Sequence, residues 1–162
     1  MSKMTSETLP FDATIHVRDA CLCLHAQRAA RALARRFDAA FRPFGLTNGQ
    51  FSLLMALNRP EPPTLGPVAS LLAMDRTTLT AALKPLERRG LLVSEPDPDD
   101  RRSRRLKLTP EGQSLLARAY PVWCEEHAAI SWDLRNADRL RADLLALGQM
   151  PTDPATGRPE SD

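Results

Sequence analysis

One stretch decides the fold: residues 65–108 read LGPVASLLAMDRTTLTAALKPLERRGLLVSEPDPDDRRSRRLKL. Its first part has helical spacing from about Leu65 to Leu72, and a polar turn at Met74 and Asp75 then starts a second helix. Asp75 is the expected N-cap of that helix, and Gly90 its expected end. The buried face of the second helix is expected to carry three leucines, Leu79, Leu83 and Leu86.

After this second helix, the pattern changes from helical to extended. Residues 91–95 (LLVSE) and 104–108 (RRLKL) are expected to pair as antiparallel strands, with the polar, proline-containing segment 96–103 as the tip of the hairpin. The order helix, turn, helix, charged hairpin is that of a winged helix-turn-helix. We therefore predict a mainly α fold with a small β-hairpin wing.

This arrangement suits DNA, because the second helix of such a pair fits the major groove, where each base pair shows a distinct pattern of donors and acceptors. The contacts predicted on the solvent side of that helix are Arg76, Thr77, Thr78, Thr80 and Lys84. On the hairpin, a projecting arginine can enter the minor groove, where the negative potential is enhanced. The contacts predicted there are Asp100, Arg101, Arg102 and Arg104, with Asp100 expected to hold a neighbouring arginine.

Charge supports the same interpretation. Between Lys84 and Lys107 there are eight basic residues and five acidic ones, a net charge of +3, while the whole chain carries only +2. A locally basic surface suits a protein that meets a polyanion along one face. One alternative is a solvated hairpin whose charges only prevent edge pairing. Another is a winged helix used for protein interaction, which an arginine-rich wing disfavours.

The rest of the chain divides around this unit. Residues 1–16 are predicted to be a flexible segment, 47–109 the winged helix-turn-helix region, and 148–162 a disordered tail. Residues 17–46 and 110–147 are predicted to form a helical dimerisation region. Their apolar stripes exceed what a small winged unit can cover, which favours a homodimer. A two-fold dimer would place two recognition helices about 34 Å apart, one turn of DNA.

Helical spacing predicts the individual helices of that region. One is expected over about 17–44 and another over about 137–147, with further helices starting from caps at Thr47 and Thr109. Pro121 is expected to interrupt the helix that Thr109 starts, because proline removes a backbone donor.

Composition excludes several classes of protein. The 162 residues are about one domain's worth, and no run of about 18 apolar residues suggests a membrane span. The first twenty residues lack an apolar signal region, and an odd number of cysteines, three, argues for a reducing cytoplasm. No glycine-rich phosphate loop, paired-carboxylate site or Ser/His/Asp arrangement is visible, so we expect neither an enzyme nor a cofactor.

Several motifs together resemble the MarR family: MDRTTL at 74–79, LERRGLL at 86–92, DRR at 100–102, LKLTPEG at 106–112 and FGLTNGQF at 44–51. The resemblance covers roughly residues 17–147. It implies an obligate dimer built from the first and last two helices, palindromic operators, and repression relieved by a small molecule or an oxidant. By position, Arg102 matches the family's minor-groove arginine and Asp100 its partner. Pro85 departs from the family's uninterrupted recognition helix and is expected to bend its last turns.

The signal sensed is open, and the candidate redox residues are Cys21, Cys23 and Cys124. A lone helical cysteine such as Cys23 is more often a small buried hydrophobe than a reactive thiol. Cys21 falls on the arginine-bearing face of the expected helix, where cations favour a thiolate. With Cys124 it resembles the two-cysteine, organic-peroxide-sensing branch of the family. That branch surrounds its thiol with tyrosines, whereas this chain has only Tyr120.

Two other interpretations of the cysteines are weaker. Cys21 and His25 stand at i and i+4, yet a tetrahedral metal site would also need His16, His127 or Cys124. His127 lies on an apolar stripe and is more simply a core histidine, so we predict no metal. A thiol oxidoreductase is disfavoured because a Cys-x-Cys pair on a continuous helix points its thiols about 200° apart.

A small organic effector is the remaining signal, and it rests on the resemblance. It would occupy a cleft between the dimerisation helices and the DNA-binding lobe, with lining residues expected to include Arg28, Phe51 and Met55. The identity of the effector, the operator sequence and the choice between repression and activation stay open at this point.

Overall fold

The computed structural model describes residues 8–100 and 102–150. It is mainly helical with one two-stranded antiparallel hairpin, as predicted. In chain order the elements are α1 (Phe11–Ala20), α2 (Leu22–Phe41), the 3-10 helix η1 (Arg42–Phe44), α3 (Asn48–Leu57), α4 (Leu65–Leu71), α5 (Arg76–Arg88), β1 (Leu92–Pro96), β2 (Arg104–Leu108), α6 (Pro110–Asp133) and α7 (Ala137–Gly148).

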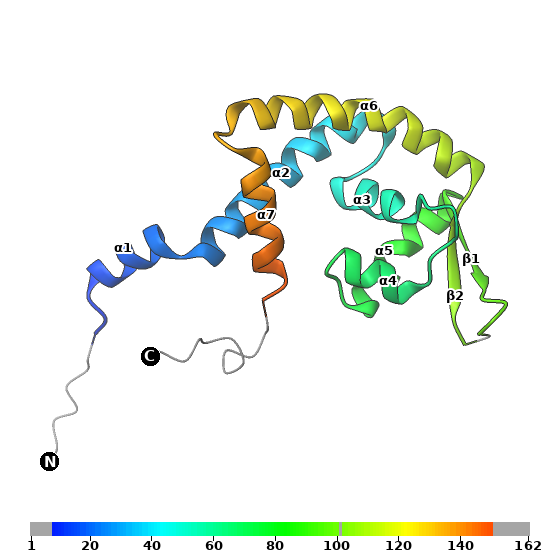
Figure 1. The fold of residues 1–162 in the computed structure, drawn as a ribbon, viewed down its shortest axis with the longest axis horizontal. Helices are drawn as coiled ribbons and strands as arrows, with labels where there is room; N and C mark the ends of the chain where they lie inside the picture. The colour runs from blue at the N-terminus through cyan, green and yellow to red at the C-terminus, as the bar shows by residue number, and fades with distance from the viewer. Residues whose placement is uncertain (1–7, 101, 151–162) are drawn as a thin grey trace, which may run out of the picture.

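The elements form a lobe and an extended helical arm (Figure 1). The lobe contains α3, α4, α5 and the hairpin, and α6 runs along its upper side, with α7 turning down from the far end of α6 in this view. Helix α2 leads away from the lobe, and α1 continues outward from its end. Of the described helices, none is long and apolar enough to cross a membrane.

The core lies where α2, α3, α5, the hairpin and α6 meet. Its fully buried large side chains are Phe41, Leu54, Val68, Leu79, Leu86 and Leu92. The predicted buried face of α5 is confirmed, since Leu79, Leu83 and Leu86 are all buried. The hairpin pairs Leu92 with Leu108 and Ser94 with Leu106, so it places one row of leucines against the lobe.

Local chemistry explains where the helices begin. The Asp75 carboxylate accepts the backbone N–H of Thr78 at 2.8 Å, which confirms Asp75 as the cap of α5. Thr47 and Thr109 cap α3 and α6 in the same way, as predicted. Gly112, in the first turn of α6, must be glycine, because a Cβ there would lie 2.0 Å from the carbonyl oxygen of Leu91.

The expected single helix over 17–44 is wrong, because the chain breaks at Cys21. Cys21 has an extended backbone (ψ 104°), and its sulfur accepts the N–H of Leu24 as the N-cap of α2. Residues 11–16, expected to be flexible, belong to α1. Asp12 in the first turn of that helix and Arg18 in its last turn complement the helix dipole. Residues 1–7 lie outside the described part.

Pro121 disturbs its helix less than predicted. Helix α6 continues through Pro121 to Asp133, and α5 continues past Pro85 to Arg88. Each proline removes one backbone bond, while buried neighbours such as Leu86 and Ala119 hold the helices to the core. Smaller differences are a hairpin shifted by one residue in its first strand and an α7 that includes Gly148. The rest of the expected tail, 151–162, is not among the described residues.

Candidate nucleic-acid interface

The exposed face of α5 gathers most of the residues predicted to contact bases. Arg76, Thr77, Thr80 and Lys84 are exposed and, with Ala81, line a shallow depression of about 330 Å³. The leucines of α5 point the other way, into the core. The apolar face of α5 therefore packs against the core, and its polar face is accessible to a ligand.

Two of the threonine hydroxyls already have partners within the helix. Thr78 donates to the Asp75 carboxylate at 2.5 Å, and this bond lowers the pKa of Asp75. Thr80 donates to the backbone carbonyl of Arg76 at 2.7 Å. Thr78 therefore stabilises the start of α5, whereas Thr77 is exposed and lines the depression.

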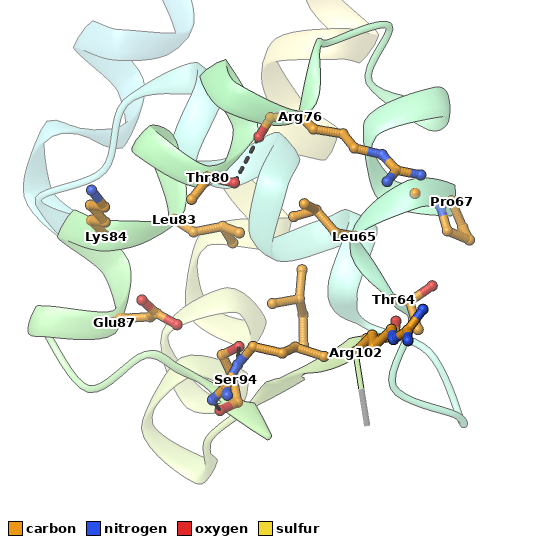
Figure 2. A pocket seen from close by; sticks show the side chains of 14 residues that line it. Thr64, Leu65, Pro67, Arg76, Thr80, Leu83, Lys84, Glu87, Ser94 and Arg102 are labelled. Carbon is orange, nitrogen blue, oxygen red and sulfur yellow. Dashed lines mark hydrogen bonds between the residues drawn. The ribbon is translucent and has the colours of Figure 1, made fainter. Parts of the chain in front are cut away.

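A larger groove of about 620 Å³ separates α5 from the hairpin (Figure 2). Figure 2 shows Arg76, Thr80 and Lys84 on the α5 side, Ser94 and Arg102 on the hairpin side, and the start of α4 closing one end. The charged side chains in its lining are Arg76, Lys84, Glu87, Arg102 and Arg104, so cations dominate. A groove with this charge fits a phosphate backbone running between the helix and the wing.

The wing tip holds the backbone of Arg102 in place. Asp100 Oδ1 accepts the N–H of Arg102 at 3.0 Å, and the carbonyl of Asp100 accepts the N–H of Ser103 at 2.8 Å. The Arg102 side chain stays exposed at the mouth of the groove. Asp100 thus acts on the main chain of its neighbour, while Arg101 lies outside the described residues.

The next two arginines are turned toward the protein. Arg104 donates across the hairpin to the hydroxyl of Ser94 at 2.7 Å and to the Ser94 carbonyl. Arg105 pairs with Asp97 and Asp99, each at 3.1 Å. Arg105, Ser94 and Asp97 were not among the predicted contacts, because their partners depend on the strand register, which sets Glu95 opposite Arg105, and on the geometry of the tip.

Asp97 is the buried member of this network, with 7% of its surface exposed. The Arg105 guanidinium and the N–H of Asp99 lower the pKa of Asp97 below its usual range. The base of the wing is also tied to the proline-rich loop, because the N–H of Leu106 bonds to the carbonyl of Pro63 at 2.8 Å. The wing is therefore braced at both ends.

A second cavity, of about 310 Å³, lies between α3, α4 and α6, lined by Phe51, Ser52, Met55, Ala56, Leu71, Tyr120 and Trp123. Next to it, Met55 and Tyr120 also line a space of about 470 Å³ that includes Asn58 and Gln113. Two of the three expected effector-binding residues, Phe51 and Met55, therefore come together. Arg28 does not, since it is exposed on α2 and absent from the lining.

The cysteines have ordinary surroundings. Cys21 and Cys124 are half-buried. The expectation that Cys23 is a small buried hydrophobe is wrong, because Cys23 is exposed, and its sulfur accepts a bond from Gln27 at 3.1 Å. Near Cys21 in the chain, Arg18 pairs with Asp19, and the ring of His25 bonds to the Asp19 carbonyl. Across residues 8–100 and 102–150, no three His, Cys, Asp or Glu side chains gather as a metal site would need.

Comparison with known proteins agrees with this geometry. The MarR family model matches residues 46–103. A putative transcriptional regulatory protein for the hcr operon of Thauera aromatica is 30% identical over 66% of this chain and 69% of its own length. The M. tuberculosis transcriptional regulator MosR, solved in complex with DNA, is 36% identical, with a TM-score of 0.74 over 80% of this chain and 94% of its own.

A third relative is BpsR of Bordetella bronchiseptica, whose DNA binding is regulated by 6-hydroxynicotinic acid. It is 26% identical, with a TM-score of 0.69 over 83% of this chain and 96% of its own. The family-model match over residues 46–103 includes α5 and β1, which line the groove between α5 and the wing. The chain belongs to the MarR family and is a winged-helix DNA-binding transcription regulator.

Proposed function

We propose that the chain is a homodimeric repressor that binds a palindromic operator and is released by a small organic ligand. The observation that carries the DNA-binding part is the groove between α5 and the wing, whose lining contains four cations and one carboxylate. Arg76, Thr77, Thr80 and Lys84 read the major groove, and Arg102 enters the minor groove. Thr78, Asp100 and Arg104 support these contacts from within the protein.

The ligand-controlled part rests on the cavity beside Phe51 and Met55. It lies between α3 of the DNA-binding lobe and α6 of the helical region, so its occupant would touch both. A ligand that fits only one arrangement of these helices shifts the equilibrium toward that arrangement. If the favoured arrangement does not fit the operator, ligand binding lowers the affinity of the dimer for DNA.

The first test removes the minor-groove arginine. Arg102→Ala should weaken binding to the selected operator about tenfold and reduce the slope of log K against log salt by about one, because one phosphate-rich contact is lost. Fluorescence anisotropy over a salt series measures both. Arg135→Ala is the matched control, since it removes the same charge from the exposed connection between α6 and α7. Unchanged binding by Arg102→Ala would contradict the assignment of the wing.

A second candidate signal is oxidation of Cys21. Its sulfur caps α2 at the junction with α1, so a change at that sulfur alters the point where the two helices meet. An organic hydroperoxide would transfer one oxygen to the Cys21 thiol, which gives a sulfenic acid while the alcohol leaves. The sulfenic acid could then condense with the thiol of Cys124, releasing water.

Operator release by cumene hydroperoxide tests this candidate. If Cys21 is the sensor, Cys21→Ser should hold the operator at peroxide concentrations that release at least about half of the wild-type protein. Cys23→Ser is the control, because Cys23 is exposed and caps no helix. Equal release of Cys21→Ser and wild type would leave the small organic ligand as the signal.

A further inference from the structure

The wall of the second cavity is uncharged. None of the described residues that line it, or that line the adjoining space, is Asp, Glu, Lys, Arg or His. The one cation that sequence reasoning placed there, Arg28, is exposed on α2 instead. A charged ligand would therefore find no counter-ion among the described residues of this wall.

We propose that this cavity takes an uncharged, flat aromatic compound with neutral hydrogen-bonding groups at its edge, and that it discriminates against aromatic carboxylates. The proposal rests on the ligand-controlled function above and makes it specific.

The rings are held in place by a chain of aromatic contacts that begins and ends at the cavity. Phe51 stacks on Phe41 with centroids 4.4 Å apart, and Phe41 meets Phe37 at 5.8 Å. On the other side, Trp123 stacks on Tyr120 at 5.9 Å. Aromatic rings prefer offset-stacked or edge-to-face partners, so fixed rings on two walls favour a flat aromatic guest.

His127 closes this chain, stacked on Trp123 at 4.0 Å and beside Phe37 at 4.7 Å. Burial lowers the pKa of His127, the nearby backbone carbonyl of Trp123 opposes this by favouring the protonated ring, and the Arg141 charge lowers it further. The imidazole is therefore neutral near pH 7, so the ring next to the cavity supplies no cation. Its buried Nδ1 finds no partner within the described part of the chain.

The polar groups of the lining are all neutral. Ser52 and Tyr120 offer hydroxyls to the first cavity, and Asn58 and Gln113 offer amides to the adjoining one. Contact with the Cys124 thiol raises the pKa of Tyr120, so its hydroxyl keeps its proton. Such groups satisfy an amide, a phenol or a ketone. A carboxylate here would lose its water without gaining a counter-ion, which is costly.

Matched pairs of ligands test the proposal. We would titrate the homodimer with benzamide and benzoate, 2-naphthamide and 2-naphthoate, and indole-3-carboxamide and indole-3-carboxylate. The indole N–H resonance of Trp123, one of two tryptophans, reports binding in the full chain. At least one amide should bind about tenfold or more tighter than its carboxylate and should weaken operator binding.

Ser52→Arg supplies the missing cation. It should reverse the preference, favouring the carboxylate of the same pair about tenfold, because the anion then finds a partner. Ser114→Arg, on an exposed position of α6 outside the lining, should leave the preference unchanged. A circular dichroism melt of each variant would check that it folds.

The outcomes separate the two proposals. If carboxylates bind more tightly to the wild type, the ligand class is overturned while ligand control stands. If no pair shifts the Trp123 resonance, this cavity is not the ligand site, and the ligand-controlled part of the function falls with it. Operator binding, measured separately, is unaffected by either result.

Discussion

At the wing, neighbouring arginines have different partners. Arg102 is exposed beside the groove, whereas Arg105 is bonded to Asp97 and Asp99. Arg105 therefore stabilises the shape of the tip that presents Arg102. Because Asp97 is buried, its ion pair with Arg105 is less screened by water than the pair of Arg105 with the exposed Asp99.

Acid should weaken this brace. The pKa of Asp97 is lowered from its ordinary 3.8 by Arg105, so its contribution to stability is present above that value and is lost as pH falls through the lower folded-state pKa. Asp97→Asn should therefore melt at a lower temperature than wild type near pH 7, and the difference should shrink below about pH 3. Thermal unfolding by circular dichroism across pH measures this.

Asp99→Asn is the control, because the Asp99 side chain is 85% exposed and its pairing with Arg105 is screened by water. It should change the melting temperature much less than Asp97→Asn. A difference between Asp97→Asn and wild type that persists undiminished in acid would show that lost charge pairing is not its cause.

Single residues were predictable where their chemistry is local. Asp75, Thr47 and Thr109 cap their helices as their spacing indicated, because a cap needs only the next three residues. The partners of Arg104 and Arg105 were not predictable in this way. They lie on the opposite strand or in the tip, and strand register and turn geometry decide which ones come within reach.

At the scale of elements, the end of α5 is tied by Arg89 to the segment that follows α2. Arg89, which follows α5, donates to the carbonyl of Gly45 at 2.7 Å and to that of Phe44 at 3.4 Å. These carbonyls end η1, the continuation of α2, where a positive charge is favourable. Arg89 therefore links the orientation of α5 to the helical arm.

Arg89→Ala should weaken operator binding several-fold without changing its salt dependence, because this arginine orients α5 and touches no phosphate. It should also lower the free energy of unfolding by about 1 kcal/mol. Arg88→Ala is matched to it, since it removes the same exposed charge one residue earlier and has no side-chain bond among the described residues. A smaller salt slope for Arg89→Ala would instead indicate a DNA contact.

The helices themselves were predictable from periodicity, but the break at Cys21 and the continuity through Pro121 were not. Periodicity is continuous through Cys21, and only tertiary geometry shows that the backbone leaves the helix there. Conversely, Pro121 looked like an interruption, yet α6 runs through it. Packing against the core outweighs one lost hydrogen bond, and packing is what a single sequence states least directly.

At the scale of the whole molecule, the cavity shows the same limit. Phe51 and Met55 share one helix and were expected together, whereas Tyr120 and Trp123 reach them from α6, far along the chain. Arg28 was expected there from the family resemblance, as a residue of the first helix, but it lies on an exposed face. The placement of distant segments decides the lining, and with it the class of ligand.

The helical arm leaves apolar surface without cover in a single protomer. Neither α1 nor α7 buries a residue, and Phe11, Trp132, Leu140, Leu144 and Leu145 are among the exposed large apolar side chains. Figure 1 shows α1 and the start of α2 projecting away from the lobe. Surface of this kind is typical of a subunit interface.

We expect Leu144→Asp, with the target side chain 47% exposed on α7, to weaken the dimer at least about tenfold, because a charge would be buried between subunits. Sedimentation velocity at micromolar concentration should show monomer, and binding should fall to that of one operator half-site. Val93→Asp adds the same charge at a wing residue that is 39% exposed and should remain dimeric. If Leu144→Asp and Trp132→Asp both stay dimeric, the interface lies on another face, because a charge placed in the centre of an apolar interface would weaken the dimer.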